Sequence, residues 1–123
     1  MCKILLSINP EHVENIFSGI KQYEFRKRKC IQEVDKIIIY SSAPVMKVVG
    51  EAKVEAVLED TPSRVWSKTK SKSGISKSFF QKYYDGRNTA FAFKLSDVVK
   101  YEHPKELSSY GIKAAPQSFV YIK

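Results

Sequence analysis

The chain has 123 residues, 43% hydrophobic and 28% charged, a length that suits one compact domain over residues 1–123 and excludes two ordinary ones. Because it has neither a secretory leader pattern nor an apolar segment long enough to span a bilayer, we expect a reduced cytoplasmic protein without membrane association. Its 21 Lys and Arg against 13 Asp and Glu give a net charge of +8, which favours an anionic partner such as nucleic acid.

The first predicted elements are a buried strand and an amphipathic helix. Residues 3–8 are rich in branched aliphatic side chains, as expected of a short buried strand. Asn9 caps the helix and Pro10 begins it, because proline at the first helical position leaves no N–H unpaired. Gly19 ends the helix by adopting the left-handed conformation. The apolar face of this helix consists of Val13, Ile16, Phe17 and Ile20.

The rest of the chain is dominated by predicted strands. From residue 22 the pattern has a period of two, which places Tyr23 and Phe25 in the core and Glu24 and Arg26 on the opposite face. Further strands are predicted over residues 35–41, 48–58, 88–94, 97–102 and 118–122.

Residues 61–86 interrupt the strands with helical sequence. Pro62 begins a short helix that gives way to a mobile Lys/Ser-rich loop over residues 67–74, and Ser76 caps a second short helix. We therefore expect a mainly β (α+β) fold, a small, partly open β-barrel of about six strands with two or three short helices covering its ends. A parallel βαβ fold needs more crossover helices than this sequence offers.

The positive charge is concentrated in two segments. Residues 21–30 hold five basic residues and one acidic residue, and residues 61–88 hold seven and one, so the remainder has a slight acidic excess. This clustering predicts that one part of the surface binds an anion. The alternative is a set of lysine-rich loops that only keep the protein soluble.

The strongest candidate site is the segment Gly-Ile-Lys-Gln-Tyr-Glu-Phe-Arg, residues 19–26. It places Lys21 at a turn from helix to strand, with Glu24 and Arg26 on one strand face. Lysine and arginine supply donors for phosphate, and glutamate supplies an acceptor for an amino group or a water. The alternative is an exposed strand with salt bridges and no ligand.

The pattern Gly-x-Lys-x-x-Glu-x-Arg, which follows a helix introduced by Ser-Ile-Asn-Pro, resembles the ASCH domain, a PUA-like β-barrel family. The resemblance extends to residues 74–77, 79–80, 83–86, 90–93 and 115–119 and so covers most of the chain. It implies a cleft, lined by Lys21, Glu24 and Arg26, that accommodates RNA or a nucleotide. Flanking phosphate contacts are expected from Arg28, Lys68, Lys70, Lys72 and Lys77, and Trp66 is either a stacking platform for a base or a plug for one end of the barrel.

An RNA- or nucleotide-binding module is therefore the main hypothesis, with DNA a possible partner. The alternative is a hydrolase of single-stranded RNA or of an N4-acetylcytidine-type nucleoside, with Lys21 and Glu24 catalytic. In the family's amidohydrolase branch, a nucleophilic threonine stands at the position of Glu24, and an acidic residue lies on the later helix. This chain has glutamate at the first position and no acidic residue between Thr61 and Tyr84. A third hypothesis is a protein-binding cofactor of transcription.

We expect no metal centre and no cofactor, and the sequence leaves use of a dissolved divalent ion and the oligomeric state open. The candidate ligands have no zinc spacing and are interpreted as structural or exposed; they are Cys2, His12, Cys30 and His103. The aromatic residues of the second short helix are more typical of a core than of base stacking; they are Phe79, Phe80, Tyr83 and Tyr84.

Overall fold

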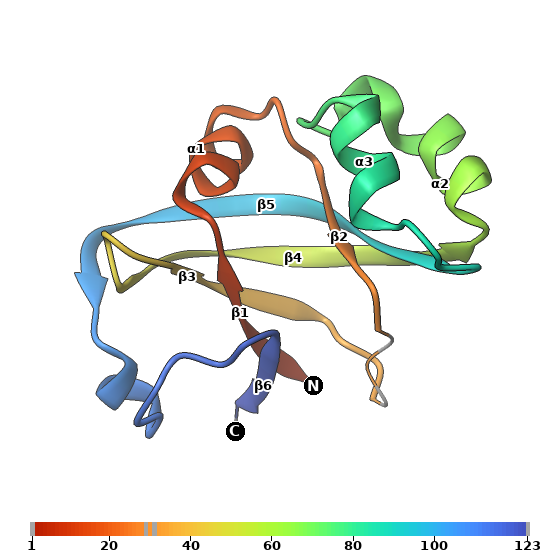
Figure 1. Ribbon diagram of the computed structural model, residues 1–123. Coiled ribbons are helices and arrows are strands. Elements are labelled where there is room, and N and C mark those ends of the chain that lie inside the picture. The colour runs from red at the N-terminus through yellow and green to blue at the C-terminus, as the bar shows by residue number, and fades with distance from the viewer. Residues whose placement is uncertain (1, 29, 31, 123) are drawn as a thin grey trace.

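The computed structural model describes residues 2–28, 30 and 32–122 and contains a six-stranded mixed half-barrel with three α-helices (Figure 1). The strands are β1 (Lys3–Ile8), β2 (Tyr23–Arg26), β3 (Lys36–Ser41), β4 (Lys47–Asp60), β5 (Ala90–Lys105) and β6 (Phe119–Ile122). The helices are α1 (Pro10–Ser18), α2 (Pro62–Thr69) and α3 (Lys77–Tyr83), with 3-10 turns η1 (Lys70–Lys72) and η2 (Leu107–Tyr110). The expected mainly β architecture is confirmed.

The sheet has the strand order β2-β5-β4-β3-β1-β6, in which β1 and β3 are parallel and the other neighbours antiparallel. In this order β1 and β2 are far apart, although they are consecutive strands of the chain. The curl of the half-barrel brings them together, since Arg26 Nη2 on β2 donates to the Ser7 carbonyl on β1 at 3.2 Å. This contact marks a seam where the two strands meet without pairing.

Helix α1 begins and ends where the capping residues predict. Asn9 Oδ1 accepts a hydrogen bond from the Glu11 N–H at 2.9 Å, and Gly19 closes the helix with φ of 87°. Val13 and Ile16 are buried against the sheet as expected. The expectation for Ile20 was wrong: its side chain is 59% exposed, because the helix has already ended at Ser18.

Strand β2 is covered on both faces. Phe25 packs with Val65, Phe80 and Tyr84 in a cluster beneath α2 and α3. The side chain of Glu24, the preceding residue, points to the opposite side of the strand, toward α1. Figure 1 shows β2 passing between α1 and α3. The alternation predicted for β2 therefore places an apolar residue in a core and a carboxylate beside a helix.

The Lys/Ser-rich segment differs from its expectation. It is helical rather than a loop, since α2 extends to Thr69 and continues into η1. Thr69 and Ser73 are buried there. Their hydroxyl groups are satisfied, because Thr69 Oγ1 donates to the Val65 carbonyl at 2.8 Å and Ser73 Oγ donates to the Lys70 carbonyl at 3.2 Å. Small hydroxyl side chains thus satisfy helical carbonyl groups, which the repeated Lys/Ser pattern conceals.

Candidate functional site

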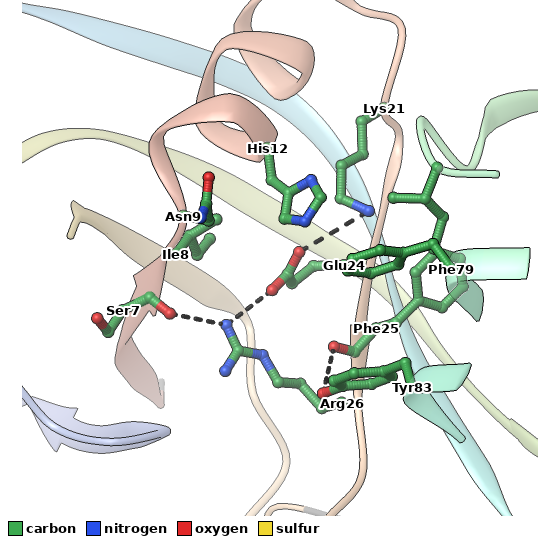
Figure 2. Close-up of a pocket in the computed structure, with 11 residues that line it drawn as sticks. Ser7, Ile8, Asn9, His12, Lys21, Glu24, Phe25, Arg26, Phe79 and Tyr83 are labelled. Atoms are coloured by element: carbon green, nitrogen blue, oxygen red, sulfur yellow. Dashed lines mark hydrogen bonds and ion pairs between the residues drawn. The ribbon is translucent and has the colours of Figure 1, made fainter. Parts of the chain in front are cut away.

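A cavity of about 160 Å³ lies at the seam between β1 and β2, bordered by α1 and α3 (Figure 2). Pockets for whole small molecules usually measure about 300–1,000 Å³, so this one suits a single base or one phosphodiester group. Its lining combines polar and aromatic side chains: Ser7, Ile8, Asn9, His12, Lys21, Glu24, Phe25, Arg26, Ile75, Phe79 and Tyr83.

Lys21 is a buried cation whose position is set from several sides. Its side chain is 2% exposed, and Nζ donates to the Ser73 carbonyl at 2.9 Å. The same Nζ lies 4.0 Å from Glu24 Oε1 and 4.7 Å from the centroid of the Phe25 ring. Burial lowers the pKa of Lys21, and the charge of Glu24 opposes this effect. Lys21 is therefore a restrained ammonium group that loses its proton more easily than an exposed lysine.

Glu24 lies between the two cations of the site. Arg26 Nη2 donates to Glu24 Oε2 at 2.7 Å, on the side away from Lys21 (Figure 2). The side chains of Glu24 and Arg26 are 8% and 13% exposed. A buried carboxylate beside two cations leaves the group with one net positive charge. The cluster is therefore suited to hold an anion.

His12 belongs to the site, although its sequence position suggested only a structural or exposed role. It is half-buried on the first turn of α1, and its ring meets Phe79 edge-on at a centroid distance of 5.5 Å. Burial, followed by the positive charge of Lys21, lowers the pKa of His12 below its ordinary value of 6.5. Near neutral pH the imidazole is therefore uncharged and able to accept a proton.

Two buried polar atoms, His12 Nδ1 and Arg26 Nε, have no hydrogen-bond partner among the described residues, and both side chains line this cavity. Buried polar atoms without partners cost free energy, and in proteins they commonly bind a ligand or water. One sequence signal could have placed His12 in the site. It lies three residues after Asn9, which also lines the cavity, and residues three apart share one helix face.

Helix α3 divides its aromatic residues between the core and the cavity. Phe80 and Tyr84 are buried, as expected of core residues. The core expectation was wrong for Phe79, which is 47% exposed and borders the cavity together with Tyr83. The Tyr83 hydroxyl donates to the Phe25 carbonyl at 3.3 Å, and burial raises the pKa of this phenol. Tyr83 is therefore a neutral hydrogen-bonding group at the cavity wall.

The other predicted contact residues lie outside this cavity. Arg28 borders a separate cavity of about 410 Å³. Trp66 and Lys77 border another, of about 470 Å³, between α2 and α3. Lys68 lies 3.8 Å from an Asp60 oxygen, and Lys70 and Lys72 are exposed on η1. The structure thus brings Lys21, Glu24 and Arg26 together in one cavity. The other predicted contact residues do not line it, and their binding roles stay predictions.

Over residues 2–28, 30 and 32–122, no group of three or more His, Cys, Asp or Glu side chains is placed to hold a metal ion. Cys2 and Cys30 are free thiols. None of the helices in the same residues has both the length and the apolar character needed to cross a bilayer.

Comparison with protein families gives a match over residues 2–117 to a domain of unknown function, DUF365. A curated relative, the large ribosomal subunit protein uL22 of Ureaplasma parvum serovar 3, is 34% identical over 121 residues. These cover 98% of this chain but only 39% of the relative. The chain therefore spans well under half of that protein.

A second curated relative is an ASCH domain-containing ribonuclease from Zymomonas mobilis, 33% identical over 94 residues. The match covers 76% of this chain and 64% of the relative. The crystal structure of ASCH from Zymomonas mobilis superimposes with a TM-score of 0.89 at 28% identity, covering 98% of this chain and 87% of that one. Sequence and three-dimensional structure thus both match an ASCH protein of Zymomonas mobilis.

Proposed function

This chain belongs to the ASCH domain (DUF365) family of PUA-like proteins, and on that premise we propose that it cleaves single-stranded RNA in the cavity between β1 and β2. The observation that carries the proposal is the Glu24 carboxylate held between Lys21 and Arg26, with His12 lining the same cavity. The relative named as a ribonuclease supports RNA as the substrate.

Cleavage of RNA by its own 2′-hydroxyl needs three kinds of group, and the cavity offers each of them. A base takes the proton from the 2′-hydroxyl, whose oxygen then forms a bond to the adjacent phosphorus. Cations stabilise the negative charge that builds up on the phosphate oxygens. An acid donates a proton to the departing 5′ oxygen as its bond to phosphorus breaks. The products are a 2′,3′-cyclic phosphate end and a 5′-hydroxyl end.

His12 is the base in this proposal, because its lowered pKa leaves it unprotonated near neutral pH. Lys21 is the acid, since burial makes its ammonium group a better proton donor than an ordinary lysine. Arg26 holds the phosphate through donors that Glu24 and Ser7 do not occupy, Nε among them. Glu24 is a positioning residue that raises the pKa of Lys21 and holds both cations in place.

The proposed flanking residues contact phosphates of the RNA strand on either side of the cleaved bond. Arg28, Lys68, Lys70 and Lys72 are exposed and carry the positive charge that a phosphate backbone requires. Because they lie outside the cavity, we assign them to binding of RNA rather than to its cleavage.

The test is cleavage of a 5′-labelled single-stranded RNA by the purified protein, with the product ends identified by mass. We expect cyclic phosphate ends, no cleavage of DNA of the same sequence, and loss of cleavage in Lys21→Met and His12→Gln. Lys113→Ala, an exposed lysine remote from the cavity, is the matched control and retains full activity.

Two results would replace this proposal. RNA that is bound in the cavity but never cut indicates an RNA- or nucleotide-binding module. Release of acetate from N4-acetylcytidine, with RNA left intact, indicates an amidohydrolase in which Glu24 stands where the related enzymes have threonine.

A further inference from the structure

Helix α3 separates the proposed cleavage cavity from a second, larger cavity. Phe79 and Tyr83 of α3 border the first, whereas Phe80 and Tyr84 border the second, which measures about 470 Å³ and lies between α2 and α3. An α-helix with its side chains is about 10–12 Å across, and a stacked nucleic-acid strand advances about 3.4 Å per nucleotide. A strand that crosses the full width of α3 would therefore need about three nucleotides to reach from one cavity to the other.

The second cavity contains an aromatic surface beside basic residues. Trp66 is half-buried, packs on Phe80 at a centroid distance of 4.9 Å, and borders the cavity. The exposed side chains of Lys77 and Arg87 line the same space, and Gln81 of α3 adds a neutral polar side chain to it. A broad aromatic ring near cations is the combination that single-strand binding proteins use.

The charges at this cavity favour a polyanion. Neither Lys77 nor Arg87 forms an ion pair with a carboxylate in the part of the chain that the structure describes. One carboxylate, Asp85, also lines the cavity, and it is exposed to solvent. The cavity lining thus retains a positive excess that an RNA backbone can neutralise.

We propose that the groove between α2 and α3 binds a nucleotide of the same RNA strand a few positions from the cleaved bond, with its base on Trp66 and its phosphates on Lys77 and Arg87. This inference rests on the proposed function, because it takes single-stranded RNA as the ligand. Such a subsite explains why a small cavity is sufficient for cleavage. The groove between α2 and α3 supplies affinity and makes the protein select RNA chains over single nucleotides.

Trp66 is the only tryptophan of the chain, so its fluorescence reports on this groove directly. The experiment titrates the protein with 2′-O-methyl uridylates, which cannot be cleaved, of one, two, three and six nucleotides. We expect the hexamer to quench Trp66 and the mononucleotide to leave it unchanged. Lys77→Ala with Arg87→Ala should weaken hexamer binding at least about fivefold, whereas Lys82→Ala, an exposed lysine of α3 outside both cavities, should not.

A labelled hexamer, followed by anisotropy, provides a measurement that does not depend on tryptophan emission. Trp66→Phe should bind the hexamer nearly as well as the parent, and Trp66→Ser at least about fivefold more weakly. Two results overturn the subsite: a hexamer that binds without quenching Trp66, or inorganic polyphosphate that binds as tightly and quenches as much.

Cleavage of unmodified RNA is measured in parallel, so that the two proposals can fail separately. If RNA is cleaved while Trp66 gives no response, the groove is not a subsite and the proposed function stands. If Trp66 responds and no RNA is cleaved, the proposed function fails and the groove remains a binding site.

Discussion

Gly74 lies directly against Lys21: a Cβ atom at Gly74 would come within 2.5 Å of the Lys21 Cβ. The preceding residue, Ser73, accepts the hydrogen bond from Lys21 Nζ through its carbonyl. The backbone of η1 also contacts this region, because the Gln22 N–H donates to the Lys72 carbonyl at 2.8 Å. The turn after the Lys/Ser-rich helix therefore fixes the position of the buried lysine.

The first prediction concerns Gly74→Ala. The added methyl group displaces Lys21, so we expect RNA cleavage to fall at least about tenfold and the free energy of unfolding to fall by more than the roughly 1 kcal/mol that the positive φ alone costs. Gly111→Ala is the matched control, since φ is 72° at Gly111 and 68° at Gly74 but no atom lies within 4 Å of a Cβ at Gly111. Equal losses in the two variants would show that only backbone strain matters.

The second prediction concerns Glu24→Gln, which leaves Lys21 and Arg26 as buried cations without a carboxylate. Breaking a buried ion pair commonly costs about 3 kcal/mol, so we expect a similar loss in denaturant unfolding. Because Glu24 raises the pKa of Lys21, its removal should also move the alkaline limb of the activity profile to lower pH. Glu14→Gln, an exposed site on α1, is the control. An unmoved alkaline limb contradicts the positioning role of Glu24.

The third prediction is a bell-shaped dependence of cleavage on pH. The rate should rise as His12 loses its proton, at a pH below 6.5 because burial lowers the pKa of this group. It should fall as Lys21 loses its proton, at a pH below 10.5 for the same physical reason. His12→Gln should remove the acid limb from whatever activity remains. An acid limb that persists in this variant would assign the base to another residue.

The fourth prediction concerns Arg26→Lys. Arg26 Nη2 alone donates to both the Glu24 carboxylate and the Ser7 carbonyl, which leaves Nε without a partner in the described part of the chain, and a lysine has no second nitrogen to offer a phosphate. We expect kcat for RNA cleavage to fall at least about tenfold and the melting temperature to decrease, since the contact between β1 and β2 is weakened. Wild-type kinetics in Arg26→Lys would show that charge alone is sufficient at this position.

The fifth prediction concerns the dependence of RNA binding on salt. If about six phosphates are neutralised, log K should fall against log salt with a slope near −4. Removing Lys70 and Lys72 together should reduce the slope by about 1.4 if each contacts one phosphate, whereas removing Lys53 and Lys113 should not. A slope that stays unchanged without Lys70 and Lys72 would exclude the turn η1 from the contact with RNA.

Local sequence patterns were sufficient for α1, for β2 and for one part of the site, but not for α2 and η1, which were expected as a loop from residue 67, nor for β5, which was expected as two strands. Asn9, Pro10 and Gly19 delimit α1 because their effects on the backbone act within one turn. The period of two in β2 was likewise enough to place Glu24 and Arg26 together, opposite Phe25, because alternate residues of a strand share a face. The resemblance to the ASCH family added the prediction that Lys21, Glu24 and Arg26 line a common cleft.

The rest of the site depends on contacts between segments far apart in the sequence. His12 and Glu24 line one cavity only because the half-barrel curls until β1 and β2 meet, and no local periodicity reports that curvature. Lys21 is buried rather than mobile because residues Ser73 and Gly74, about fifty positions later, fold over it. Charge clustering grouped the lysines of α2 and η1 with the cleft, but none of their side chains lines the cavity, since net charge carries no information about the direction in which a side chain points.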